Sequence, residues 1–184
     1  MTYIIRPAAT LFITAVITIA ALSFVYNLTY EPIQISRQRK QEAAMMAVLP
    51  EASDFRVMQT RMSGNMVAVF EGISNGVVVG YIVSLSPKGY DDTIDMMVGI
   101  CATNETISGM RIVQHSETPG LGALAARPEF YRRFDNRPLI PLGVVRTSPG
   151  EHDIAAITSS TITTRAITNA VNEAIEWYRA GGFR

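Results

Sequence analysis

The pattern of apolar and polar positions begins with a long uncharged stretch. No charged residue lies between Arg6 and Glu31, and residues 11–28 are mostly apolar. An uncharged run of about 20 residues is long enough to cross the hydrocarbon core of a bilayer as a helix. A cleaved signal peptide is the alternative, because residues 21–23 form a small-x-small pattern. Since the apolar run continues past that pattern, an uncleaved transmembrane anchor over residues 1–30 is favoured.

A more polar segment follows the apolar run. It is rich in Gln, Arg, Lys, Glu and Ala, which favours a helix over residues 31–50, with Pro32 near its start and Pro50 at its end. No Gly/Ser-rich linker follows. We therefore predict a helical stalk that leads directly into one folded domain over residues 51–184.

The pattern then changes to short β-rich segments. Asn75 and Gly76 separate two of them and are typical of a tight hairpin turn. We expect strands near residues 66–70, 77–83, 95–102, 107–114 and 144–146, and a short helix at 128–134. The short connections between the first four strands favour antiparallel pairing. With helices at both ends of the domain packed on this sheet, the predicted fold class is α+β, an antiparallel sheet with helices.

A helical period returns near the C-terminus, preceded by the hydroxyl-rich Thr158–Thr164 motif. The apolar face is expected to contain Ile162, Ala166, Ile167, Ala170, Val171, Ala174, Ile175 and Tyr178, and the polar face Arg165, Thr168, Asn172, Glu173 and Glu176. Hydroxyl side chains cap free N–H groups at helix starts. The same N–H groups and the helix dipole also attract phosphate. A simple cap and a phosphate site both stay open here.

A second motif lies before this helix, in the segment Glu117-Thr118-Pro119-Gly120-Leu121-Gly122, called here the Glu117–Gly122 loop. Proline followed by glycines makes a tight turn whose backbone can approach a ligand closely. Taken alone, the loop is either an ordinary turn or a ligand loop.

Composition excludes several functional classes. Lys plus Arg and Asp plus Glu each total 16, so the formal charge is zero and gives no electrostatic case for nucleic acid. Cys101 is the only cysteine, and only two histidines are present, so neither an internal disulfide nor a Cys/His metal centre is expected. The chain shows no nucleophile–base pair and no nucleotide fingerprint, so the residues alone do not indicate an enzyme with a substrate site of its own.

The anchor, the Glu117–Gly122 loop and a Thr-x-x-Thr at a helix start together resemble the covalently flavinylated FMN-binding domain family. The resemblance covers essentially the whole chain and is greatest to the G subunits of Rnf-type ion-translocating ferredoxin:NAD oxidoreductases. The C subunits of sodium-translocating NADH:quinone oxidoreductases share the motif and the anchor, but the shorter chain favours the former. From another class, a membrane-anchored binding or assembly module without flavin is the alternative.

In that family the attachment motif reads Asp-x-x-Ser/Thr-Gly-Ala-Thr, and its last threonine carries FMN through a phosphoester bond. The resemblance implies that Thr161 is the bonded residue and that Thr158 takes the Ser/Thr place. Ser159 and Ser160 stand where the family has Gly and Ala, and Ala155 stands where it has Asp. The serine at 159 fits this motif if the position needs no positive φ.

The resemblance also implies which residues surround the cofactor. The expected FMN-binding residues are Thr161, Thr158, Ser159, Ser160, Thr163, Tyr90, Thr118, Gly120, Leu121 and Gly122. Tyr90 either stacks on the flavin ring or is an ordinary turn or core tyrosine. Glu117 is expected to order the loop, and the hydroxyls of Ser160, Thr163 and Thr164 to add hydrogen bonds to phosphate oxygens.

As the resemblance implies, the protein is an electron-transfer subunit that relays electrons through FMN. Ferredoxin and NAD chemistry would belong to other membrane and peripheral subunits of the Rnf complex, and a flavin transferase would attach the FMN. The family implies a single-pass protein in the bilayer of a bacterial or archaeal plasma membrane, with the FMN domain on the extracytoplasmic side. The positions of Arg6, Arg37, Arg39 and Lys40 weakly favour the opposite orientation.

Overall fold

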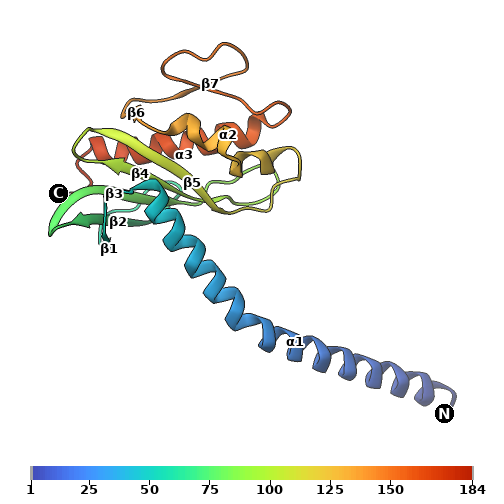
Figure 1. Cartoon of the computed structure of the whole chain (residues 1–184). Helices are drawn as coiled ribbons and strands as arrows, with labels where there is room; N and C mark the ends of the chain where they lie inside the picture. Colours follow the sequence, from blue (N-terminus) through green and yellow to red (C-terminus); the bar gives the residue numbers. More distant parts are fainter. Residues whose placement is uncertain (1, 184) are drawn as a thin grey trace. The chain divides into compact units, whose positions relative to one another are not determined.

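A computed structural model describes residues 2–183 of the protein, with side chains from residue 6 onward. Met1 and Arg184, the ends of the predicted anchor and domain, lie outside this range. The chain divides into two compact units, Met1–Lys40 and Gln41–Arg184. The first is helical, and the second contains the sheet and the remaining helices (Figure 1).

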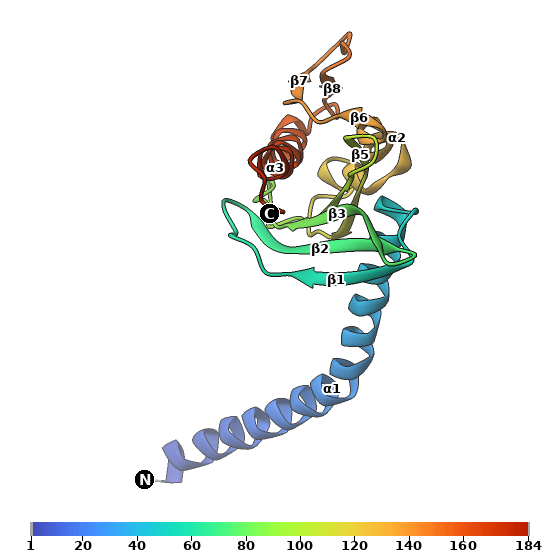
Figure 2. The ribbon, with the colours of Figure 1, turned by 90° about the vertical axis from the view of Figure 1, so that its left-hand side faces the viewer.

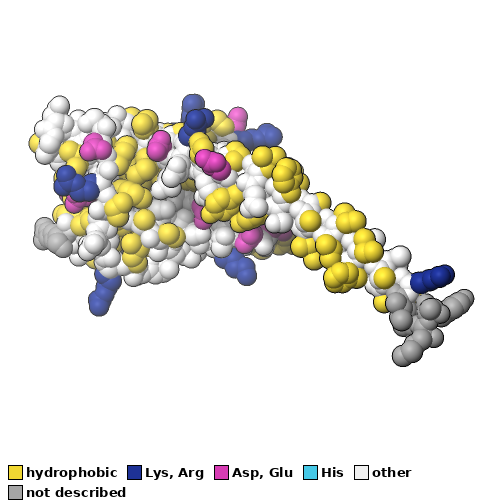
Figure 3. All heavy atoms as spheres, turned by 90° about the horizontal axis from the view of Figure 1, so that it is seen from below, with side chains coloured by type: hydrophobic (Ala, Val, Ile, Leu, Met, Phe, Trp, Pro, Cys, Tyr) yellow, Lys and Arg dark blue, Asp and Glu magenta, His cyan; other side chains and the backbone are white. Residues whose placement is uncertain are grey.

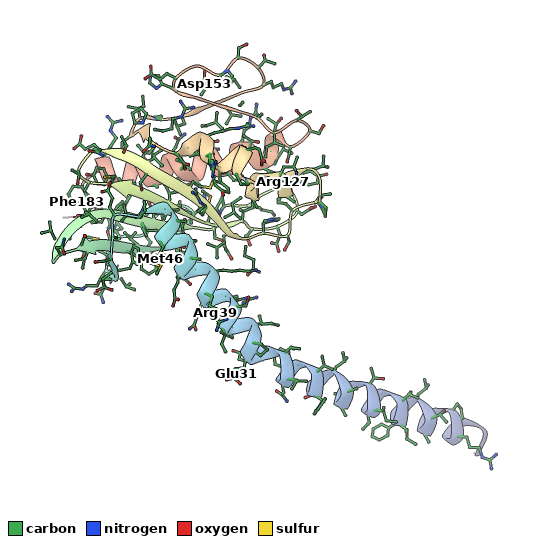
Figure 4. All side chains as sticks on the ribbon, in the orientation of Figure 1. Glu31, Arg39, Met46, Arg127, Asp153 and Phe183 are labelled. Atoms are coloured by element: carbon green, nitrogen blue, oxygen red, sulfur yellow. The ribbon has the colours of Figure 1, made fainter. Side chains whose placement is uncertain are left out.

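The N-terminal helix α1 runs without interruption from Thr2 to Val48. It continues through Pro7 and Pro32, although each proline removes one backbone hydrogen bond, and it ends just before Pro50. The predicted anchor and stalk are therefore one continuous helix. Its apolar stretch is long enough to cross a membrane and is not buried in the protein. Hydrophobic side chains cover the visible face of this stretch (Figure 3), and the polar part that carries Glu31 and Arg39 follows it (Figure 4).

The main sheet confirms the predicted antiparallel arrangement. Its six strands pair in sequence order: β1 (Asp54–Met58), β2 (Met66–Ser74), β3 (Val77–Leu85), β4 (Asp95–Cys101), β5 (Thr106–Gln114) and β6 (Arg137–Pro138). The predicted hairpin joins β2 and β3, with Asn75 and Gly76 both at positive φ, at 52° and 78°. Positive φ at both central residues is the geometry of a type I′ turn.

Shorter elements connect the sheet to the C-terminal helix α3 (Thr161–Arg179). They are η1 (Gly122–Ala126), α2 (Pro128–Tyr131), η2 (Arg132–Phe134), β7 (Gly143–Val145) and β8 (Asp153–Ala155). The predicted helix at 128–134 is observed as α2 and η2, and the predicted strand at 144–146 as β7. The pairing of β7 with β8 is parallel and was not predicted.

Both faces of the sheet are covered, as predicted for a domain with helices at its two ends. On one face, the side chains of Val83 and Val98 belong to the same core cluster as Ile167 and Val171 of α3, which lies over this face (Figure 2). On the opposite face, the alternate residues Phe70, Ile82 and Met97 form a second cluster with Val48 and Leu49 at the end of α1. Alternation along the strands therefore produces two cores.

The end of α1 approaches the sheet closely at Gly99. The hydroxyl of Ser108, on the neighbouring strand, donates a hydrogen bond to the carbonyl of Val48. A side chain at Gly99 would overlap that carbonyl. Glycine at this position thus lets the helix end pack directly on β4.

Two residues of α3 differ from the predicted helical face. Ile162 was assigned to the apolar face but is exposed, and Thr168 was assigned to the polar face but is fully buried. The Thr168 hydroxyl donates to the carbonyl of Thr164 one turn earlier, at 2.9 Å, which satisfies it inside the core. The buried face of the first turns is thus built from threonines, and Ile162 is left to face outward.

Candidate functional site

The Glu117–Gly122 loop and the Thr158–Thr164 motif meet at one cavity of about 390 Å³. Its lining residues come from the turn before β4, the loop after β5 and the start of α3: Tyr90, Glu117, Thr118, Leu121, Gly122, Ser159, Ser160, Thr161, Ile162 and Thr163. A cavity of this size falls within the range of small-molecule sites. Two motifs some 40 residues apart therefore form one site, here called the ring cavity.

The start of α3 lines the ring cavity. The helix begins at Thr161, after Ser160 at φ −137°, and no side chain caps it. The N–H groups in the first turn of an α-helix have no acceptor within the helix. The simple-cap interpretation of the Thr158–Thr164 motif is thus not what the structure shows. The uncapped N–H groups and the positive end of the helix dipole instead favour a bound anion.

Ser159 adopts the left-handed backbone conformation, with φ at 62°. Glycine takes this conformation without strain, whereas other L-residues are destabilised by about 1–2 kcal/mol. Serine was expected to fit this position if it needed no positive φ, and this condition is not met. The turn into α3 keeps the geometry expected of a glycine, and Ser159 accommodates it.

The hydroxyls of the motif fall into two groups. Those of Ser160, Thr163 and Thr164 point inward: Ser160 donates to Thr163 at 2.9 Å, and Thr164 donates to the carbonyl of Ser160 at 3.0 Å while accepting from the N–H of Ile157 at 3.1 Å. Within residues 6–183, the hydroxyls of Thr158, Ser159 and Thr161 have no hydrogen-bond partner. Thr158 and Ser159 are exposed, whereas the side chain of Thr161 is half-buried at the cavity. The expectation that Ser160, Thr163 and Thr164 donate to a phosphate thus differs from the structure, in which all three hydroxyls donate to groups within the domain.

Glu117 is buried at the centre of the site, with 5% of its surface exposed. One carboxylate oxygen accepts from the N–H groups of Tyr90 and Asp91, at 2.7 and 3.3 Å. The other accepts from the hydroxyl of Thr163 at 2.7 Å. A carboxylate with hydrogen bonds to both oxygens tolerates burial far better than an unpaired one. Glu117 therefore joins the turn that contains Tyr90 and Asp91, called here the Tyr90 turn, to the start of α3. The sequence had predicted only that Glu117 orders its own loop.

Two glycines make room for this carboxylate. A side chain at Gly89 or at Gly122 would overlap the Glu117 oxygens. Gly122 was predicted to line the cofactor site, and the structure adds a packing reason for it. A carboxylate that needs glycine on two sides has no signature in a single sequence.

The Glu117–Gly122 loop forms a type II turn. The N–H of Leu121 donates to the carbonyl of Thr118 at 3.2 Å, Pro119 occupies the second position, and Gly120 follows at φ 79°. The Thr118 hydroxyl donates to Asp91 at 2.5 Å, a second link to the Tyr90 turn. Gly120 does not line the ring cavity, and its conformation serves the turn.

Exposed apolar side chains surround the ring cavity. Tyr90 is 66% exposed, Ile162 57% and Leu121 41%. Tyr90 is thus not a core tyrosine. A planar apolar ligand could bury these three side chains, each by removing apolar area from water. Ile162 was not among the predicted site residues, because its position in the helical period assigned it to the core.

All of the predicted cofactor-binding residues line the ring cavity except Thr158 and Gly120. Thr158 is exposed beside it. Ala155 lies in β8, where the family has Asp. The nearby Asp153 (labelled in Figure 4) instead accepts from the N–H of Gly150 at 3.1 Å. The cavity volume, its apolar surroundings and the unpartnered Thr161 hydroxyl together fit a flavin whose phosphate lies at the helix start.

The sequence is similar to known proteins over most of its length. A family profile described as "FMN-binding domain" matches residues 89–176. The G subunit of an ion-translocating oxidoreductase complex from Methanosarcina acetivorans is 31% identical over 96% of this chain and 95% of that protein. The G subunit of the Na⁺-translocating ferredoxin:NAD⁺ oxidoreductase complex from Acetobacterium woodii is 32% identical over 92% and 88%.

The fold is shared with a solved structure. The crystal structure of the C subunit of the Na⁺-translocating NADH-quinone reductase from Parabacteroides distasonis aligns with a TM-score of 0.61. The alignment covers 83% of this chain and 94% of that protein, at 16% sequence identity. At this identity the likeness concerns the fold alone.

Proposed function

The chain belongs to the family of G subunits of ion-translocating oxidoreductase complexes, and we propose that its FMN is bound covalently, through phosphate, to Thr161. It carries an FMN-binding domain. It is an electron-transfer subunit of a membrane-bound oxidoreductase of the ferredoxin:NAD type, the type named for its Acetobacterium woodii relative.

The unpartnered hydroxyl of Thr161 is the observation that carries the covalent assignment. The hydroxyls of Ser160, Thr163 and Thr164 already donate hydrogen bonds within the domain, and the side chains of Thr158 and Ser159 are exposed. Thr161 is the first residue of α3 and lines the ring cavity. A phosphoester at this oxygen would place the phosphate charge beside the free N–H groups of the first helical turn.

The remaining residues of the site hold and shield the cofactor. FMN supplies one- and two-electron redox chemistry, and attachment through phosphate leaves its ring unmodified. Tyr90, Leu121 and Ile162 offer apolar surface for the ring and exclude water from it. Glu117 fixes the backbone of Tyr90 at the edge of the cavity.

The protein is a membrane protein with one candidate transmembrane helix among the described residues, the apolar part of α1. We place the FMN domain on the extracytoplasmic side, where a covalent tether prevents loss of FMN to a compartment without a flavin pool. Other membrane and peripheral Rnf subunits would carry the ferredoxin and NAD chemistry. A flavin transferase would form the ester.

The C subunit of an NADH:quinone oxidoreductase is the second candidate identity and has weaker support. Its likeness to this chain is a shared fold at 16% identity, whereas the relatives above 30% identity are G subunits. A membrane-anchored module without flavin would leave the Thr161 hydroxyl and the exposed apolar side chains without a role.

Flavin fluorescence on a denaturing gel tests the proposed attachment. The full-length protein is produced together with a flavin transferase, and a fluorescent band is expected for the wild type. Thr161→Ala should abolish the band because it removes the ester oxygen, and Thr161→Ser should retain it. Thr103→Ala, at an exposed threonine in the β4–β5 turn, is the matched control. A band of wild-type intensity in Thr161→Ala would reject the assignment, and no band in the wild type would favour the module without flavin.

A further inference from the structure

A second hollow lies beside Thr161, apart from the ring cavity. Its volume is about 420 Å³, and it is lined by Arg146, Ala156, Ile157, Thr158, Ser159 and Thr161. Ser159 and Thr161 line both spaces. The side chain of Thr161 therefore stands at the boundary between the ring cavity and this Arg146 hollow.

The β7–β8 pair places Arg146 at the second hollow. Val145, the last residue of β7, pairs with Ala155 of β8, and the N–H of Ala156 donates to the carbonyl of Val145 at 2.7 Å. Arg146 follows Val145 directly. The parallel pair thus fixes the backbone of Arg146 next to the segment that enters the Thr158–Thr164 motif.

Arg146 is a free cation, unlike its neighbours. Arg133 donates to the carbonyls of Glu129 and Ala155, and Arg137 donates to those of Arg133 and Glu151. In the part of the chain with described side chains, Arg146 makes no hydrogen bond or ion pair, and its side chain is exposed. No other Lys or Arg lines either space. Its guanidinium therefore remains available to bind an anion.

The two spaces differ in their charged side chains: Glu117 lines the ring cavity, and Arg146 lines the second hollow. The buried carboxylate of Glu117 accepts from the hydroxyl of Thr163, which in turn accepts from the hydroxyl of Ser160. A phosphate group is repelled by that carboxylate and attracted by a guanidinium, which binds phosphate oxygens through charge-assisted hydrogen bonds. The apolar flavin ring instead favours the ring cavity, because the exposed side chains of Tyr90, Leu121 and Ile162 surround that cavity.

We propose that the Arg146 hollow is the phosphate subsite of the FMN site and that Arg146 positions the phosphate at the Thr161 hydroxyl. The inference rests on the proposed attachment of FMN at Thr161. The cofactor then lies across Thr161, with its ring in the cavity that contains Glu117 and its phosphate on the side of Arg146. Arg146 acts before the ester forms, by binding the phosphate, and afterwards by balancing its charge.

Comparison of FMN with riboflavin, which lacks the phosphate, tests this subsite. Full-length protein is produced without flavin transferase, kept in detergent and titrated with each flavin while flavin fluorescence is followed. The wild type should bind FMN more tightly than riboflavin. Arg146→Ala should raise the Kd for FMN by about tenfold, the effect of one charge-assisted hydrogen bond, and leave that for riboflavin unchanged. Arg146→Lys should recover part of the affinity, and Arg132→Ala, at an exposed arginine of η2, is the control.

Three results would overturn the phosphate subsite: equal binding of FMN and riboflavin by the wild type, an unchanged Kd for FMN in Arg146→Ala, or an equal rise in both Kd values. The gel assay separates this outcome from failure of the covalent assignment. A fluorescent band together with no effect of Arg146→Ala on FMN binding rejects only the subsite. An Arg146-dependent preference for FMN without any band rejects only the ester.

Discussion

A carboxylate can be buried beside a cofactor cavity only when protein donors replace the water around it. Glu117 meets this condition with the N–H groups of Tyr90 and Asp91 and the hydroxyl of Thr163. These donors lie on two separate segments, so the same carboxylate that is stabilised by them also holds the Tyr90 turn against α3. Glu117 therefore organises the site by holding two of its segments together.

Replacing Glu117 by glutamine should loosen the Tyr90 turn. The amide keeps one acceptor but loses the charge and presents N–H groups to existing donors. We expect a loss of about 1–3 kcal/mol in the free energy of unfolding. Hydrogen exchange of the Tyr90 and Asp91 amides should become faster, whereas Glu129→Gln, at an exposed glutamate of α2, should change neither. Unchanged exchange at Tyr90 and Asp91 in the Glu117 variant would contradict this role.

Ser159 provides a second test at the scale of a single residue. Its φ of 62° strains a serine but not a glycine. Glycine also costs more conformational entropy on folding, but this free-energy cost is smaller than the strain that glycine relieves. Ser159→Gly should therefore raise the free energy of unfolding by about 0.5–1 kcal/mol.

The control for Ser159→Gly is Thr158→Gly, at the neighbouring position, which has no positive φ. There glycine relieves no strain and only its entropy acts, so stability should fall. Both variants can be compared by thermal unfolding of the full-length protein in detergent. If Ser159→Gly destabilised the protein as much as Thr158→Gly, the strain assigned to Ser159 would be wrong.

The sequence identified the residues of the site better than their roles. Thr161, Tyr90 and Leu121 were predicted to surround FMN and do line one cavity. Ile162 and Arg146 were missed, because the helical period assigned Ile162 to the core and Arg146 had no motif. The inward donation by Thr163 could not be foreseen either, since it depends on where Glu117 lies in space.

At the scale of elements, short sequence patterns predicted the helices and turns that depend on residues close together in the chain. The Asn75-Gly76 hairpin, the central strands and the helix that follows the Thr158–Thr164 motif were all predicted and are present. The two-residue strand β6 and the parallel β7–β8 pair were not, because such short strands are stabilised by their partners and carry little pattern of their own. Without β8, the sequence offered no reason to place Arg146 near Thr161.

The packing of α1 on the sheet gives a prediction at this scale. Gly99 pairs with Gly109 on the next strand, but only Gly99 lies directly against the Val48 carbonyl. Gly99→Ala should force the helix end away and lower the free energy of unfolding by about 1–3 kcal/mol. At Gly109 the nearest atom to an added methyl group is a carboxylate oxygen of Asp135 at 3.2 Å, so Gly109→Ala should have a smaller effect. Equal effects in urea unfolding would contradict direct packing of α1 on β4.

On the scale of the whole molecule, the proposed function combines a membrane anchor and an FMN domain in one chain. The helix α1 supplies an apolar stretch without charge between Arg6 and Glu31 and continues into the domain core at Val48 and Leu49. Lys and Arg residues after the stretch weakly favour a cytoplasmic domain. Assembly with partner subunits is a physical reason for such a single-span anchor to adopt the opposite orientation.

A reporter fused after Arg184 tests the orientation. We expect a reporter that is active only outside the cytoplasm to be active there, and a reporter that is active only in the cytoplasm to be silent. The same two reporters fused before Met1 serve as controls and should give the reverse result. Activity of the C-terminal fusion only in the cytoplasm would overturn the proposed topology and the reason given for the covalent tether.

The central claim is one covalent bond, between the phosphate of FMN and the Thr161 oxygen, and peptide mass mapping tests it most directly. Trypsin cleavage after Arg146 and Arg165 releases residues 147–165, which contain the whole Thr158–Thr164 motif. In protein produced with a flavin transferase, this peptide should carry the mass of FMN less one water, with fragment ions that place it on Thr161. An unmodified peptide, or fragments that place the flavin on Thr158 or Thr163, would contradict the account.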